Sequence, residues 1–233
     1  MEQNSRSLII KKKNEFLFED RQDASEQLIA ELPSNIFFLE DVIVLGVSEG
    51  GVYFANTLAK KLNAPLDILL TEHIYSYINP ELAIAMVGET EEIVIHKALT
   101  DAFDIPKDYI YNEAYNKYSN EILRYIKKYR QGEKLGSLEG KYVILTDECV
   151  ETGLTMMAAV KTAISLGAKN IFIAVPVLDN VVYENLVTIC DNIFCPHRID
   201  DYISIEYYYK ELNPFSLDEI EKIMKNKNNQ GKE

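Results

Sequence analysis

The sequence predicts an α/β protein with a doubly wound parallel sheet, that is, a sheet covered by helices on both faces. Short runs rich in valine, isoleucine and leucine are apolar throughout, which is typical of strands buried on both faces. Stretches with apolar residues at helical spacing separate most of these runs. The alternation of strands and helices indicates that the strands run parallel. The predicted strands span 41–47, 65–70, 140–148, 170–178 and 190–196.

The first third of the chain contains a helix and then a strand–helix–strand unit. A helix is expected over 18–32, where alanine and leucine recur at four-residue intervals before Pro33 ends the pattern. The segment 41–70 follows as strand, Ser-Glu-Gly-Gly turn, helix and strand. Residues 80–96 then suggest two short strands around a turn-prone Gly-Glu-Thr.

A tyrosine-rich helix is expected over 107–129. Its aromatic residues recur every three or four positions and so share one face of the helix. Such a stripe packs on the core or on a second subunit, as in a homodimer, far more often than it stacks on a ligand. The stripe consists of Tyr111, Tyr115, Tyr118, Ile122, Tyr125 and Tyr129.

The second half of the chain repeats the strand–helix alternation. Helices are expected over 152–167 and 180–187, each after an apolar strand. No internal repeat or glycine-serine linker divides the chain, so we expect a single domain over 1–224 with a core at about 36–195. The tail 225–233 is almost entirely polar and is predicted to be disordered.

Composition and charge exclude several classes of partner. The chain has 24 basic and 37 acidic residues, a net charge of −13, which repels nucleic acid and anionic membranes. The apolar block 8–10 is too short for a signal peptide, and no long apolar run could span a membrane. We therefore expect a cytoplasmic protein whose cysteines, Cys149, Cys190 and Cys195, are reduced.

The stretch VILTDECVETGLT, residues 143–155, is the strongest functional signal. A buried strand ends at Asp147 and Glu148, and Thr-Gly-Leu-Thr then opens a helix. In open parallel sheets ligands bind at the carboxyl ends of strands, where helix amides are free to hold an anion. Ionised carboxylates accept hydrogen bonds from vicinal hydroxyls or hold Mg²⁺. A phosphate beside a diol describes ribose 5-phosphate.

This stretch resembles the phosphoribosyl diphosphate-binding motif of type I phosphoribosyltransferases. Further segments are similar to a bacterial family of phosphoribosyltransferases, in matching order across 16–224. The resemblance implies a parallel core sheet and a small hood, which the chain ends would build, and a phosphoribosyl compound as the small-molecule partner. The further segments begin at Phe18 (FEDRQDASEQLIAEL), Val42 (VIVLGVSEGGVYFANTLAKKLNAPLDILLTEHI), Asn79 (NPELAIAMVG) and Ile171 (IFIAVPV).

The resemblance also assigns roles to individual residues. Asp147 and Glu148 would bind the ribose hydroxyls, and Mg²⁺ would be held through the diphosphate, with these two carboxylates as candidate ligands. Glu151 would be a general acid or base toward the incoming base, unless it is a solvated loop residue. The predicted 5-phosphate contacts are Cys149, Val150, Thr152, Gly153, Leu154 and Thr155. The predicted pyrophosphate loop is Ser48, Glu49, Gly50 and Gly51, whose glycines would permit an open, strained backbone.

Two residues depart from the family pattern. Glu49 and Glu72 stand where relatives carry basic residues, and a carboxylate facing diphosphate would repel it. Either these two glutamates point away from the diphosphate, or they hold a metal, or they mark a chain that no longer binds diphosphate.

The resemblance thus predicts a transferase that moves ribose 5-phosphate to a nitrogenous base, with a non-catalytic nucleotide or phosphoribosyl diphosphate sensor as the alternative. A structural oligomer would leave the acidic loop unexplained. The motif does not name the acceptor base.

Overall fold

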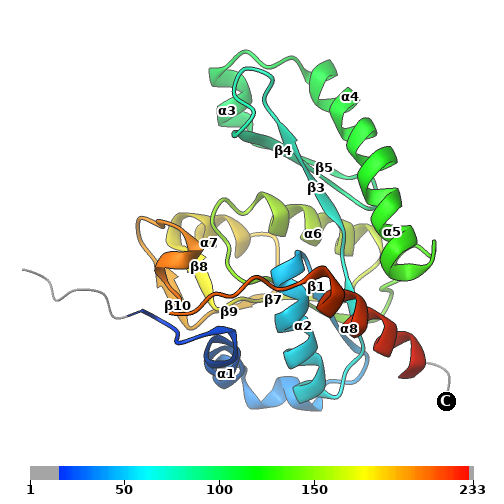
Figure 1. The fold of residues 1–233 in the computed structure, drawn as a ribbon, viewed down its shortest axis with the longest axis vertical. Helices are drawn as coiled ribbons and strands as arrows, with labels where there is room; N and C mark the ends of the chain where they lie inside the picture. The colour runs from blue at the N-terminus through cyan, green and yellow to red at the C-terminus, as the bar shows by residue number, and fades with distance from the viewer. Residues whose placement is uncertain (1–15, 231–233) are drawn as a thin grey trace, which may run out of the picture.

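A computed structural model describes residues 16–230 and confirms the predicted α/β fold (Figure 1). Its centre is a parallel five-stranded sheet with the order β2-β1-β6-β7-β9. Each strand lies within a run that the sequence marks as a strand. The strands are β1 (Val42–Gly46), β2 (Leu66–Ile68), β6 (Tyr142–Thr146), β7 (Asn170–Ala174) and β9 (Asn192–Phe194).

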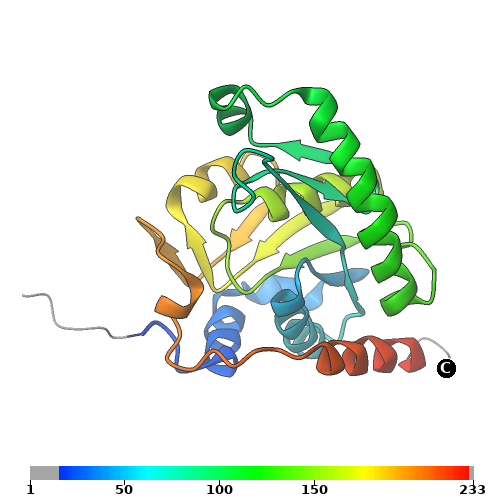
Figure 2. The same ribbon diagram turned by 45° about the horizontal axis from the view of Figure 1, so that its top comes forward.

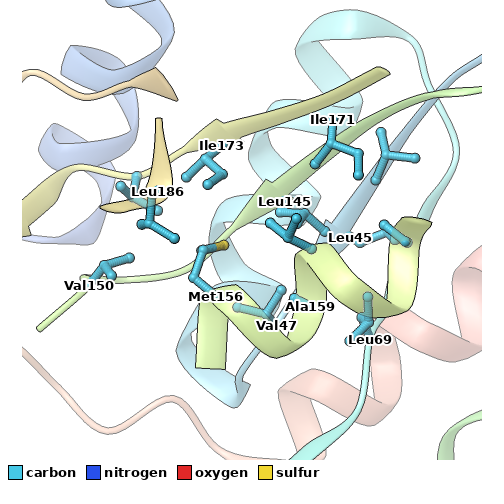
Figure 3. Packing of buried hydrophobic residues seen from close by; sticks show 14 of the residues in the cluster. Leu45, Val47, Leu69, Leu145, Val150, Met156, Ala159, Ile171, Ile173 and Leu186 are labelled. Atoms are coloured by element: carbon cyan, nitrogen blue, oxygen red, sulfur yellow. The ribbon is translucent and has the colours of Figure 1, made fainter. Parts of the chain in front are cut away.

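Helices cover both faces of this sheet. Val44 and Ile144 point toward α1 and α2, whereas Leu45 and Leu145 point toward α6 and contact the cluster around Met156 (Figure 3). Burying each such aliphatic side chain contributes about 1.5–3 kcal/mol. This two-sided burial explains why the strands are apolar throughout. The helices are α1 (Arg21–Glu31), α2 (Glu49–Leu62), α6 (Leu154–Ser165) and α7 (Asn180–Leu186).

A second, antiparallel sheet with the order β3-β4-β5 projects from the core. It rests on α6, where Met86 and Val94 pack against Leu154 and Ala158. The sequence predicts the hairpin of β4 and β5 around Gly-Glu-Thr but not β3, whose short, partly exposed Thr-Glu-His-Ile-Tyr carries no clear pattern. The three strands are β3 (Thr71–Tyr75), β4 (Ala83–Gly88) and β5 (Ile93–Ile95).

The tyrosine-rich segment is helical, as predicted, and lies beside the antiparallel sheet (Figures 1 and 2). Tyr118 and Tyr129 are only 8% and 4% exposed and pack on the core, whereas Tyr111 and Tyr115 are 53% and 71% exposed. A π-helical turn shifts the face that the helix presents, because it adds a residue to one turn. The segment comprises α4 (Lys107–Lys117), the π turn (Tyr118–Ile122) and α5 (Leu123–Arg130).

The N-terminal segment of the described chain lies beside residues 208–211, which precede α8. Phe18 forms a β-bridge with Tyr209, and the amide of Leu17 donates to the carbonyl of Tyr208 over 2.9 Å. The remaining elements are β8 (Val177–Asp179), β10 (His197–Ile199), α3 (Lys97–Ala102), α8 (Leu217–Gln230) and 3₁₀ turns at Ser34–Phe38 and Ile205–Tyr207.

The predicted disordered tail is wrong for residues 225–230, which continue α8. Ile220 and Met224 lie one turn apart, are buried against the core, and anchor this helix. A helix that is anchored upstream adds further polar residues without a new nucleation cost. Residues 231–233 lie outside the described part of the chain.

Candidate functional site

Two strand ends meet at one edge of the central sheet and carry the predicted site residues. β1 and β6 are neighbours, and Gly46 lies opposite Thr146 in their register. The chain therefore leaves both strands at the same level, at their carboxyl ends. This register brings the predicted pyrophosphate segment, 48–51, next to the acidic loop that begins at Asp147.

The segment 48–51 begins a helix instead of forming an open loop. Ser48 is the N-cap of α2, and its hydroxyl accepts a hydrogen bond from the Gly51 amide over 2.9 Å. The predicted strained backbone is therefore wrong. The glycines serve close packing: a Cβ on Gly50 would lie 2.5 Å from Glu148 Oε2, and one on Gly51 would lie 2.7 Å from the Thr146 carbonyl oxygen.

Asp147 is buried at the contact between the two segments. Its side chain accepts hydrogen bonds from the Ser48 hydroxyl and, over 2.8 Å, from the Glu148 amide. Burial raises the pKa of Asp147 to about 7, and both hydrogen bonds oppose this shift because they favour the carboxylate. Asp147 is therefore poised to gain or lose a proton near neutral pH.

Glu148 forms an ion pair with Arg21 in the first turn of α1. Both side chains are largely buried, with exposed fractions of 15% for Glu148 and 13% for Arg21. Burial raises the pKa of Glu148, and the Arg21 guanidinium opposes the rise. The Tyr209 hydroxyl also approaches the Glu148 carbonyl, at 3.5 Å. Arg21 and Tyr209, which are distant along the chain, thus both contact the acidic loop.

Sequence reasoning missed Arg21. It lies 127 positions before Glu148 along the chain, and nothing local marks the two residues as partners. The available signal is weak: Arg21 is the one basic residue in a run of acidic and apolar residues, FEDRQDASEQLIAEL.

The next two loop residues are held by backbone and side-chain contacts. The Val150 amide donates to the Val177 carbonyl over 2.9 Å, and Val150 itself is 4% exposed. The Tyr202 hydroxyl donates to Cys149 Sγ over 3.2 Å. Burial, together with the nearby charge of Asp147, raises the pKa of Cys149 to about 12. The thiol is therefore protonated at neutral pH and unsuited to act as a nucleophile.

The loop ends at Gly153, which adopts the left-handed backbone conformation with φ of +76° and is the N-cap of α6. Glycine has no side chain to cap the helix, and the amides of Leu154, Thr155 and Met156 have no partner within it. Glu151 and Thr152 are exposed beside these amides, and Thr155 is half-buried. The structure therefore brings carboxylates, hydroxyls and helix amides to one edge, as the sequence predicts.

Glu49 and Glu72, the two residues that depart from the family pattern, lie near the carboxyl ends of β1 and β2. Glu49 is exposed in the first turn of α2, where the helix dipole favours a negative charge. Glu72 of β3 lies 3.7 Å from the Lys117 ammonium of α4. Burial raises the pKa of Glu72, and Lys117 opposes this. Among residues 16–230, no group of three or more His, Cys, Asp or Glu side chains is arranged to hold a metal ion.

The phosphoribosyl transferase domain profile matches residues 19–212 of the chain, and these include both site segments. The chain belongs to the phosphoribosyl transferase domain family. This confirms the resemblance that the motif at 143–155 indicates.

Relatives of this phosphoribosyl transferase domain agree with the assignment. Two Mycobacterium tuberculosis proteins, from strains CDC 1551 and H37Rv, each named "Putative phosphoribosyl transferase", are 28% identical over 204 residues. The match covers 88% of this chain but 45% of theirs, so the chain spans about half the length of these curated relatives. The crystal structure of TT1426 from Thermus thermophilus is 28% identical, with a TM-score of 0.72, and covers 89% of this chain and 97% of that chain.

Among residues 16–230, no helix combines the length and apolar character that crossing a membrane requires.

Proposed function

We propose that this domain binds phosphoribosyl diphosphate with Mg²⁺ and transfers ribose 5-phosphate to a nitrogenous base, releasing pyrophosphate. The observation that carries the proposal is the turn from β6 into α6. Carboxylates at Asp147 and Glu148 begin the short loop, residues 149–153, that leads to helix amides without an intrahelical partner. A diol followed by a phosphate suits this order of groups. Three free cysteines favour the cytoplasm as the place of the reaction.

In this proposal the 5-phosphate binds at the start of α6. The amides of Leu154, Thr155 and Met156 donate to its oxygens, and the positive end of the helix dipole favours its charge. The exposed Thr152 hydroxyl adds a donor from the loop. These groups are local, so they attract the phosphate even though the whole chain carries a charge of −13.

The ribose hydroxyls then face the two carboxylates. Ionised Asp147 accepts from one hydroxyl while it keeps the hydrogen bond from Ser48. Glu148 accepts from the other, sharing its charge with Arg21. Because both carboxylates are held by neighbours, they orient the sugar without a large loss of side-chain freedom.

Mg²⁺ fits this site only as a partner of the diphosphate. Residues 16–230 offer no cluster of three metal-binding side chains, so the protein does not build a closed metal site there. Asp147 and Glu148 are the carboxylates that would complete the coordination of a diphosphate-bound ion. When bound, Mg²⁺ neutralises charge on the leaving pyrophosphate.

Glu151 would handle the proton in the transfer. The bond between the anomeric carbon and the diphosphate oxygen breaks, and its electron pair leaves with pyrophosphate. A ring nitrogen of the base forms the new bond to that carbon, and its proton passes to Glu151. Glu151 is exposed at the mouth of the loop, in reach of an incoming molecule.

A second candidate function is a sensor that binds a nucleotide or phosphoribosyl diphosphate without turnover. The observation that favours it is the negative charge beside the pyrophosphate segment. Glu49 and Glu72 stand there in place of the basic residues that a diphosphate site would carry. Such a chain would keep the phosphate-binding turn and lose productive contact with the leaving group.

Calorimetric titration with phosphoribosyl diphosphate and Mg²⁺, followed by a pyrophosphate-release assay with a panel of bases, tests the proposal. Binding with release supports the transferase, binding without release supports the sensor, and the absence of binding contradicts both. The Asp147→Asn, Glu148→Gln double variant should abolish measurable binding. Its matched control is Glu40→Gln, Asp41→Asn, an adjacent exposed pair at the opposite end of β1, which should bind like the parent.

A further inference from the structure

Arg21 lies in the first turn of α1, on the face of that helix that packs on the core. Ala24 and Leu28 follow it at helical spacing and belong to the same buried cluster as Phe54 of α2. These contacts fix α1 against α2. They also fix the place from which the Arg21 side chain reaches Glu148 of the acidic loop.

The two partners of this ion pair depend on each other. Arg21 Nε and Glu148 Oε1 are both buried, and neither has a hydrogen-bond partner elsewhere among residues 16–230. Arg21 Nη1 donates to the Asn213 carbonyl, so the guanidinium is also held from a second direction. Without Arg21, the charge of Glu148 would have no ion-pair partner in the described part of the chain.

The second oxygen of Glu148 lies against the predicted pyrophosphate segment, 48–51. A Cβ on Gly50 would lie 2.5 Å from Glu148 Oε2, so the carboxylate extends from Arg21 to the start of α2. An anion bound at this segment would lie beside that carboxylate. The net charge that the anion meets there therefore depends on Arg21.

The segment 48–51 also borders a second group of carboxylates. A cavity of about 220 Å³ opens beside it, at the ends of β1 and β2, and no lysine or arginine lines this cavity. An anion at the segment therefore meets negative charge from the cavity as well as from the acidic loop. The polar lining of the cavity consists of Ser48, Glu49, Thr71, Glu72 and Tyr129.

Basic residues near the cavity are engaged elsewhere. Arg130 of α5 donates two hydrogen bonds to the buried Glu89, over 3.0 and 2.7 Å. Glu89 also accepts from the amide of Leu70, which lines the cavity, over 3.0 Å, so this pair shapes the cavity wall. Lys117 lies 3.7 Å from Glu72. These bases are therefore committed to other carboxylates.

We propose that Arg21 is a positioning residue for phosphoribosyl diphosphate, and that it lets the site distinguish this ligand from ribose 5-phosphate. Arg21 acts through Glu148: it holds the carboxylate over Gly50 and offsets its charge, so that the loop repels the diphosphate less. Among residues 16–230, Arg21 is the basic side chain that forms an ion pair with the loop 147–153. The inference rests on the proposed function, in which the 5-phosphate binds beyond this loop, at the start of α6.

Calorimetric titration of the full chain with each of the two ligands, in the presence of Mg²⁺, tests the selectivity. We expect Arg21→Met to weaken phosphoribosyl diphosphate about tenfold and ribose 5-phosphate less than about threefold. A purely structural role would weaken both ligands by the same factor, and that result would overturn the proposal.

A conservative variant and a charge control accompany this measurement. Arg21→Lys keeps the charge and should bind phosphoribosyl diphosphate within about threefold of the parent. Affinity as low as that of Arg21→Met would contradict the proposed charge effect. Arg124→Met removes one positive charge at an exposed site of α5 and should bind both ligands like the parent.

A double-mutant cycle tests whether Arg21 acts through Glu148. Glu148→Gln removes the charge that Arg21 offsets and keeps Asp147, so binding stays measurable. In this background we expect Arg21→Met to change the affinity for phosphoribosyl diphosphate less than about twofold. The same tenfold loss in both backgrounds would show that Arg21 acts independently of Glu148 and would overturn the proposal.

The parent and Arg21→Met chains together separate this inference from the proposed function. If the parent binds neither ligand, the proposed function and the role of Arg21 both fall. If the parent binds phosphoribosyl diphosphate and Arg21→Met binds it equally tightly, the function stands and the role of Arg21 is overturned.

Discussion

The turn from β6 into α6 and the cavity beside β1 and β2 are neighbouring regions that are both rich in carboxylates, yet their charges are offset in different ways. At the turn, Ser48 and Arg21 hold Asp147 and Glu148, and helix amides lie next to them. In the cavity, Glu49 lies in the first turn of α2 and so is also beside helix amides, but it has no ion-pair partner within the described chain. The partners of the carboxylates therefore distinguish the two regions, because Arg21 offsets the charge of Glu148 and nothing described offsets that of Glu49.

The two regions share one wall. Ser48 lines the cavity and also donates to Asp147 of the turn. A ligand in one region can therefore affect the other through a single hydroxyl.

Breaking the buried pair that shapes the cavity should have the largest effect. Arg130→Met leaves Glu89, which is 3% exposed, without its charge partner. We expect the free energy of unfolding to fall by about 3–5 kcal/mol, measured by urea denaturation. Arg124→Met, at an exposed arginine of the same helix, should leave it unchanged within the error of the measurement. A loss below about 1 kcal/mol for Arg130→Met would show that the pair does not organise the cavity.

Titration of Asp147 should give the acidic loop a distinctive pH dependence. Its folded pKa of about 7 lies above its ordinary value of 3.8, so the unfolded chain ionises first as pH rises. The stability contribution is complete below about pH 4 and is lost as pH rises through about 7. Between pH 5 and 8 we expect a loss of about 2–3 kcal/mol, which Asp147→Asn should remove.

The control for this measurement is Asp41→Asn, at an exposed aspartate of the opposite sheet edge, which should keep the slope of the parent. If stability is flat between about pH 5 and 8 in the parent, Asp147 is not the buried, weakly acidic group described here.

Gly51 of α2 packs so closely against Thr146 and the acidic loop that adding a methyl group to it should destabilise the chain. Gly51→Ala places a Cβ 2.7 Å from the Thr146 carbonyl oxygen, so the chain must shift. We expect a loss of about 1–3 kcal/mol in thermal or urea unfolding, although alanine favours helices more than glycine does. Gly136→Ala meets nothing within 4 Å and should be neutral. A stabilised Gly51→Ala chain would mean that α2 and the acidic loop are not in close contact.

The sequence predicts the parts of this structure that local patterns encode. Apolar runs identify all five strands of the central sheet, and the motif at 143–155 identifies the acidic loop. The predicted loop at 48–51 proves to be a helix start, because a serine N-cap and two glycines are compatible with either conformation. Arg21 and the cavity at Tyr129 depend on contacts between distant segments, which no local spacing records.

Binding of a sugar phosphate at the start of α6 is the claim on which the rest depends, and an NMR titration with ribose 5-phosphate tests it most directly. We predict that the amide signals of 152–156 shift first and farthest, and that Asp147→Asn with Glu148→Gln weakens the response. Shifts confined to the residues that line the cavity, or to surfaces away from this turn, would contradict the account.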